Sequence, residues 1–185
     1  EAFDEQVVVP QLATANDWAG LYHFYCNKLI LNYLFGNISD ALTAAEQARL
    51  HEASMAGMFI VPTFYFYESL VILSSHAELR PQQPTTHSQR ISHNRAALKS
   101  WAQSSPGNHQ HRFDLVEAEY HRVVGCRADA LELYDRAIAG AKVNGYLQEE
   151  ALANELAARF YLAWGKDKIA QDYLTNAYYG YAQWG

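Results

Sequence analysis

The sequence predicts an all-α protein built from antiparallel helical hairpins. Three observations lead to this prediction. From Asp17 onward the chain divides into segments of helical length, separated by Gly, Pro or Asn. No segment keeps the alternation of period two and the side-chain chemistry that are typical of a strand. Small residues also recur at fixed distances after three glycines, which indicates an internal structural repeat.

The first helix is predicted at residues 17–35, after a non-helical N-terminal segment. Residues 1–16 show no clear helical period, and Val7 to Pro10 favours extended backbone, so this stretch is expected to be a lead-in or linker. Residues 17–185 are then expected to form a single helical-repeat domain. We interpret the chain as a fragment of a longer protein, because it opens on Glu1 and not on Met.

Seven further helices are predicted from the residues that begin and end each segment. Pro62 suits a first helical turn, the run from Thr86 to Gln89 fits a capping box, and Asp167 is a candidate cap. The expected ranges are 39–55, 62–79, 86 to the break at 104–107, 109–124, 127–143, 147–164 and 167–184. The apolar run at 55–73 is interpreted as a buried helix and not as a membrane span, since Pro62 and Glu68 interrupt it.

The repeat begins at Gly36, Gly125 and Gly165, each between one helix and the next. At five, nine and twelve residues beyond these glycines stand Ala41, Ala130 and Ala170, then Ala45, Tyr134 and Leu174, then Ala48, Ala137 and Ala177. The alanines lie two turns apart on one helix face and allow close packing, while the residue between them is expected to fill a hole in the neighbouring helix. This pattern is typical of tetratricopeptide (TPR) repeats and predicts a TPR-like α-α superhelix. We expect about four hairpins, of which the pair at 62–79 and 86–104 is irregular.

Charge argues against a nucleic-acid-binding protein, and cysteine content argues against a disulfide-stabilised one. The net charge is −6 without a basic stripe, which argues against nucleic-acid binding. Cys26 and Cys126 are a hundred residues apart in apolar helical contexts, so they are interpreted as free thiols of a protein in the reducing cytoplasm.

A metal, a cofactor or a catalytic centre is not expected. His109, His111, Glu117 and His121 are close in sequence, but they match no HExxH or paired-Cys pattern, and we interpret them as a polar helix start and a solvated face. Glu149 and Glu150 suit the first turn of a helix, where acidic residues interact favourably with the helix dipole. The chain contains no catalytic motif, which leaves a small all-α enzyme as a minor alternative.

A concave groove is the expected binding surface, because the first helix of each TPR hairpin lines such a groove. On this register the residues facing it are Arg112, Glu119, Arg122, Leu152, Glu155 and Arg159. The alternative is that Glu119–Arg159 and Glu155–Arg122 pair across the groove and only orient neighbouring helices.

Several stretches resemble the helical-repeat region of large, mostly cyanobacterial sensor kinases. The stretches are residues 24–36, 130–138, 148–157, 160–165 and 178–184. Such two-component signalling proteins join a Ser/Thr kinase domain, an AAA/STAND ATPase, the helical region, a GAF domain and a histidine kinase. The resemblance implies a connector between ATPase and kinase modules, and none of the family's catalytic residues has a matching position here.

Two functional hypotheses follow. The first is a non-catalytic interaction or relay module whose partners are other domains of the same parent chain or another protein. The second is a sensor whose groove binds a small molecule or peptide and regulates an adjacent ATPase or kinase. A deep pocket with convergent Arg112, Arg122 and Arg159 would favour the sensor, and a broad, salt-bridged surface would favour the relay.

Overall fold

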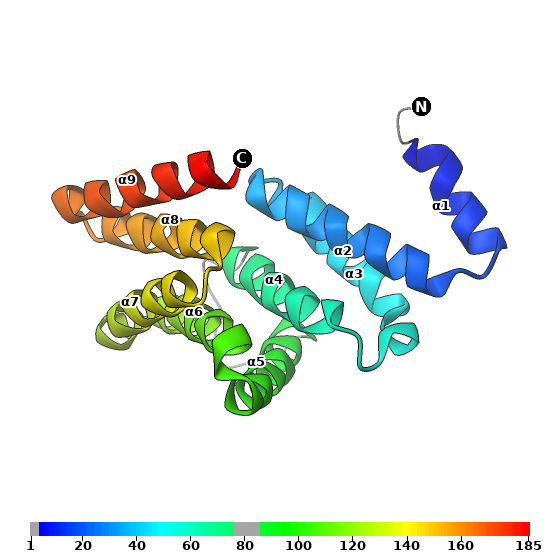
Figure 1. The fold of residues 1–185 in the computed structure, drawn as a ribbon, viewed down its shortest axis with the longest axis horizontal. Coiled ribbons are helices and arrows are strands. Elements are labelled where there is room, and N and C mark those ends of the chain that lie inside the picture. The colour runs from blue at the N-terminus through cyan, green and yellow to red at the C-terminus, as the bar shows by residue number, and fades with distance from the viewer. Residues whose placement is uncertain (1–3, 76–85) are drawn as a thin grey trace. The chain divides into compact units, whose positions relative to one another are not determined.

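The computed structural model describes residues 4–75 and 86–185, and over these residues it is all-helical, without a strand (Figure 1). The all-α prediction is therefore confirmed for the described part of the chain. The helices form two compact units, residues 1–75 and residues 76–185. The prediction of a single domain over residues 17–185 stays a prediction.

The described part of the first unit, residues 4–75, contains four α-helices and one short 3₁₀ helix. They are α1 (Glu5–Thr14), α2 (Trp18–Leu34), α3 (Ile38–Leu50), η1 (Glu52–Met55) and α4 (Ile60–Ser75). The predicted helix at 39–55 is thus broken at His51, and α4 begins two residues before Pro62. The end expected for this helix at Leu79 lies outside the described residues.

The expected lead-in at residues 1–16 is wrong for residues 5–14, which form α1. Asp4 caps the helix, its side chain accepting a hydrogen bond from the Gln6 N–H at 2.9 Å. The prediction relied on the β-branched run and the restriction before Pro10, which are local preferences. Tertiary contact overrides them, because α1 packs against α2 and Glu5 forms an ion pair with Lys28.

In the first unit, α2 and α3 form an antiparallel hairpin that α4 covers. From α2 the side chains Tyr22, Cys26, Leu29 and Tyr33 are buried, and from α3 the four alanines Ala41, Ala44, Ala45 and Ala48. Ring contacts join α2 to α4, with centroids 5.5 Å apart for Tyr22–Phe64 and 5.9 Å apart for Tyr33–Tyr67. Large rings of α2 and α4 fill the space beside the small residues of α3.

A buried ion pair connects α3 to α4. The Arg49 Nε donates a hydrogen bond of 2.8 Å to Glu68, which is fully buried, and Arg49 also contacts Glu52 at 2.9 Å. Burial acts to lower the pKa of Arg49, but the hydrogen bond to Glu68 and the negative charges of Glu68 and Glu52 together outweigh burial and raise the pKa above its ordinary value. Arg49 thus provides the buried Glu68 carboxylate with a hydrogen-bond donor and a compensating charge inside the apolar run at 55–73.

Over its described residues, 86–185, the second unit contains five α-helices. They are α5 (Thr86–Ser104), α6 (Pro106–Val124), α7 (Arg127–Val143), α8 (Leu147–Ala163) and α9 (Asp167–Trp184). α6 begins three residues earlier than expected, with Pro106 at its first position, where a missing N–H costs no hydrogen bond. Thr86 is already helical, so the position before the helix lies outside the described residues. The expected pairing of α4 with α5 joins the two units and stays a prediction.

The repeat glycines and alanines behave as the sequence predicts. Gly36, Gly125 and Gly165 have φ values of 78°, 84° and 75°, in the left-handed region that favours glycine. The most extensive helix contacts are between α2 and α3, α6 and α7, and α8 and α9, the three pairs that these glycines connect. The repeat alanines are all buried: Ala41, Ala48, Ala130, Ala137, Ala170 and Ala177.

The middle position of the repeat departs from the prediction in the last helix. Ala45 and Tyr134 are buried, but Leu174 of α9 is 42% exposed and fills no hole in a neighbour. The physical reason is that, among the described helices of this unit, only α8 lies close to the backbone of α9.

The apolar run at 55–73 lies mostly in α4, where most of its side chains are buried. Within residues 4–75 and 86–185, no helix combines the length and the apolar character that a bilayer span requires.

Candidate protein-binding surface

The predicted groove residues lie on α6 and α8, and their charges are paired inside the second unit. Arg112 Nη2 contacts Glu149 at 2.6 Å, and Arg122 Nη2 contacts Glu119 at 2.7 Å. On α8, Arg159 pairs with Glu155 one turn away. The three arginines are thus each held by a carboxylate.

Two of the predicted groove residues help to hold the helices together. Glu119 is buried and accepts a hydrogen bond from the Tyr134 hydroxyl of α7, while Leu152 is buried on α8. The observed ion pairs also differ from the alternative in which Glu119–Arg159 and Glu155–Arg122 pair across the groove. Glu119 and Glu155 each bind an arginine of their own helix, and Glu155 accepts a further bond from the Tyr181 hydroxyl at 2.8 Å.

The four residues weighed as a metal set are not brought together. His111 contacts Glu149 and stacks on Tyr146, with centroids 4.4 Å apart. Glu117 binds Arg95, with a hydrogen bond of 2.8 Å from its Nη2. The remaining two histidines have other neighbours: His109 lies beside Trp101, and His121 beside Asp129.

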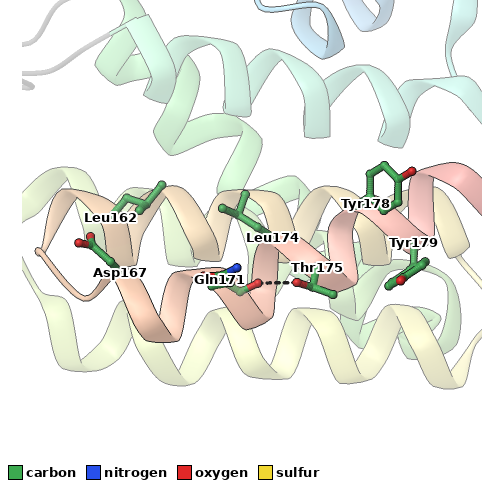
Figure 2. A pocket seen from close by; sticks show the side chains of 7 residues that line it. All are labelled: Leu162, Asp167, Gln171, Leu174, Thr175, Tyr178 and Tyr179. Carbon is green, nitrogen blue, oxygen red and sulfur yellow. Dashed lines mark hydrogen bonds between the residues drawn. The ribbon is translucent and has the colours of Figure 1, made fainter.

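The outer face of α9 carries large apolar side chains that are exposed to solvent. We use this name for a shallow hollow of about 630 Å³ lined by Leu162, Asp167, Gln171, Leu174, Thr175, Tyr178 and Tyr179. Figure 2 shows these side chains along α9, with Leu162 contributed by α8. Leu174 is 42% exposed, Tyr178 69% and Tyr179 66%. The polar neighbours Asp167, Gln171 and Thr175 lie beside them.

The opposite face of α9 packs tightly on α8. Ala170 and Ala177 are buried there, and Gly180 lies so close to α8 that an added Cβ would be 2.8 Å from the Ala151 Cβ. Small residues on the inner face let α9 approach α8 closely, while the large side chains of the outer face stay exposed.

Two tyrosine hydroxyls fix the rotation of α9 about its axis. The Tyr173 hydroxyl donates to Asp135 of α7 at 2.6 Å, and the Tyr181 hydroxyl donates to Glu155 of α8. Burial, with the hydrogen bond to Asp135, raises the pKa of Tyr173 above its ordinary value, so the hydroxyl keeps its proton. The outer face is therefore held in place before any partner binds.

Sequence reasoning missed most of this surface. The sequence of the last helix is rich in aromatic residues, among them Tyr178, Tyr181 and Trp184, but Tyr181 turns inward to Glu155. The repeat pattern nevertheless contains a signal for this surface. Leu174 is the large residue at the middle position of the last hairpin, and no later hairpin among residues 86–185 can cover it.

A second hollow lies in the first unit between α1 and α2. It has a volume of about 590 Å³, and its apolar lining includes Val8, Leu12, Phe24 and Leu31. Glu5 and Lys28, which form an ion pair, lie at its edge. The sequence could not predict this hollow, because α1 was not expected.

Comparison with protein-family models, with curated proteins and with solved structures gave no match for this chain.

Proposed function

We propose that the chain is a non-catalytic protein-interaction module, a TPR-like stack of hairpins that relays signals within a multidomain signalling kinase. The observation that carries this proposal is the outer face of α9. It combines large exposed apolar side chains with a few polar ones on a helix that is already fixed in position. Protein interfaces are enriched in aromatic residues, and their strongest contributions come from such rigid anchors.

The ion pairs of α6 and α8 favour a relay over a sensor. A pocket for an anionic ligand would require arginines whose charges are available to it. Here Arg112, Arg122 and Arg159 are each engaged by a glutamate of the same unit. The resemblance to helical regions of sensor kinases suggests that the partner is another domain of the parent chain.

The first experiment reads the open reading frame that encodes this chain. We expect it to encode kinase and ATPase segments beside the helical region. An open reading frame in which signalling domains are absent would overturn the relay, although a separate protein could still bind the outer face of α9.

The second experiment measures binding of this chain to the separately expressed flanking segments by isothermal titration calorimetry. Leu174→Glu and Tyr178→Glu place a charge on the outer face of α9 and should weaken binding by about 30-fold, the effect of losing one strong anchor. Val143→Glu is the matched control, because Val143 is 84% exposed at the end of α7 and away from the hollow. Equal affinities for all three variants and the parent chain would refute the assignment of this surface.

The sensor alternative has one observation in its favour, the apolar hollow between α1 and α2. Its test is the fluorescent dye 1-anilinonaphthalene-8-sulfonate, which binds apolar hollows. A Leu12→Asp variant that abolishes dye binding would identify this hollow as a small-molecule site. If Leu12→Asp leaves dye binding unchanged and the outer face of α9 binds flanking segments, the relay is favoured.

A further inference from the structure

The turn between α6 and α7 brings together three side chains that carry metal-binding atoms. They are His121, Cys126 and Asp129, whose imidazole nitrogen, thiol sulfur and carboxylate oxygen all lie within 4.8 Å of one another. His121 Nδ1 and the Asp129 Oδ2 are 3.5 Å apart. We refer to these three residues as the His–Cys–Asp cluster.

The local backbone explains why these residues meet. His121 lies in the last turn of α6, Cys126 directly precedes α7, and Asp129 lies in the first turn of α7. Gly125 reverses the chain with a φ of 84°, and the Cys126 N–H donates to the His121 carbonyl oxygen at 2.9 Å. The turn therefore holds all three residues on one short stretch of chain.

The imidazole of His121 leaves one nitrogen without a hydrogen-bond partner. Its Nδ1 is shielded from solvent and makes no hydrogen bond among the described residues, although Asp129 is close. A shielded imidazole nitrogen without a partner loses its interaction with water and gains nothing in exchange. A metal ion in the cluster would supply that interaction.

The charges around the cluster also favour a cation. A small polar hollow of about 280 Å³ adjoins it, and its lining includes His121 and Asp129 together with four further charged residues, Asp114, Glu117, Glu132 and Arg136. Arg136 pairs with Asp114 at 2.9 Å, and Arg95 pairs with Glu117. Among the described residues no lysine or arginine pairs with Asp129 or Glu132, so both carboxylates remain to attract a cation.

We propose that the His–Cys–Asp cluster binds a divalent metal ion of the Zn²⁺ type, with water or the Glu132 carboxylate as the fourth ligand. Nitrogen, sulfur and oxygen donors together suit borderline metals such as Zn²⁺ and Co²⁺ and do not suit Mg²⁺ or Ca²⁺. With ordinary Zn–ligand bond lengths the donors of a tetrahedral site are about 3.5 Å apart, so the side chains need to close by only about 1 Å. Cys126 and Asp129 are exposed and can make this movement.

The ion would connect the end of α6 to the start of α7. A metal ion that binds only the folded state stabilises that state, by an amount that grows with the logarithm of the free metal concentration above the Kd. The inference is independent of the outer face of α9, which lies on a different hairpin.

Cobalt titration of the reduced, chelator-treated protein tests the proposal. Thiolate-bound Co²⁺ has a near-ultraviolet charge-transfer band, and we expect this band to saturate at one equivalent of metal. Cys126→Ser should abolish the band. Cys26→Ser is the matched control and should keep it, because Cys26 is buried between α2 and its neighbours.

Zinc affinity is then measured by competition with a chromophoric chelator. Since loss of even an outer partner of a metal ligand costs about 10- to 100-fold in affinity, His121→Ala and Asp129→Asn should each weaken binding by at least about 100-fold. Asp172→Asn, at an exposed carboxylate on α9, should leave the affinity unchanged. Circular dichroism of each variant verifies that it is folded.

Two results would overturn the proposal. One is a protein without a saturable thiolate band at one equivalent of Co²⁺. The other is zinc binding that persists in both Cys126→Ser and His121→Ala, which would leave the His121–Asp129 contact as a weak ion pair at a helix start.

Discussion

Glu149 is a carboxylate with little solvent contact that nevertheless keeps its charge. Burial acts to raise its pKa, but hydrogen bonds from His111 and Arg112 outweigh burial and lower the pKa below the ordinary 4.5. Arg112 Nε donates to both carboxylate oxygens, at 3.0 and 3.1 Å. The charged carboxylate thereby connects the start of α8 to α6.

This arrangement predicts a pH-dependent contribution of Glu149 to stability. A folded-state pKa below the unfolded one gives stability that is fully present above pH 4.5 and is lost as pH falls through the folded pKa. Glu149→Gln should destabilise the protein by about 3 kcal/mol at neutral pH, since it removes one partner of a buried ion pair. The difference should shrink at about pH 3, as measured by urea unfolding at both values.

Glu150→Gln provides the control for Glu149→Gln. Glu150 is the next residue on α8, and among the described residues its carboxylate forms no ion pair. We expect this variant to follow the parent chain at both pH values. A Glu149→Gln destabilisation of the same size at both pH values would contradict the linkage.

The sequence indicated the helix start at Glu149 and Glu150 but not the different roles of the two residues. A first-turn acid is predictable from dipole and capping rules, which act within one helix. The contact with His111 depends on how α6 and α8 are placed, across 38 residues of chain. The same limit applies to the predicted groove: the sequence places its residues on α6 and α8, but it does not assign the partners of their charges.

The crossing of α8 and α9 depends on the absence of one side-chain carbon. Gly180 lies within α9, where alanine would ordinarily stabilise a helix by about 1 kcal/mol. At this position an added Cβ would lie 2.8 Å from the Ala151 Cβ and 3.3 Å from its Cα. The obstructing atoms belong to or adjoin the backbone, so the helices themselves would need to separate.

Gly180→Ala should therefore destabilise the protein, by about 1–3 kcal/mol, as overpacking commonly does. The matched variant is the exchange Gly180→Ala with Ala151→Gly, which removes the conflicting carbon from α8. We expect the double variant to be more stable than the sum of its two single changes predicts, in a thermal or urea unfolding cycle. Additive single changes would show that the two helices do not meet at these residues.

At the scale of elements, helix boundaries in the second unit were largely predictable because each has a local chemical marker. The glycine turns and residues at helix starts determine α7 and α9, whose predicted and observed ranges agree. The prediction failed where a local marker conflicts with a tertiary contact. Pro10 indicated extended backbone, but it lies inside α1, which packs against α2. The break in the helix at 39–55 had no strong marker either.

The whole molecule divides into two units between α4 and α5, a division that the repeat pattern does not predict. A repeat pattern indicates that neighbouring hairpins have similar structures, but it does not show between which hairpins the contacts are few. In the second unit, α6 contacts α7 and α8, and α8 contacts α9, so its hairpins form one continuous set. Such continuity is what a separately stable unit requires.

We predict that residues 86–185 fold when expressed alone. At about 100 residues this segment is long enough to bury a sufficient core, whereas shorter helical segments become marginal. Its buried centre is α8, with Ala153, Leu156, Ala157 and Phe160 among its buried residues. The expected result is a cooperative urea transition and dispersed amide resonances in a two-dimensional NMR spectrum. A spectrum typical of an unfolded or collapsed chain would contradict this prediction. The division into two units would then reflect the density of contacts only, and the second unit would need the first one in order to fold.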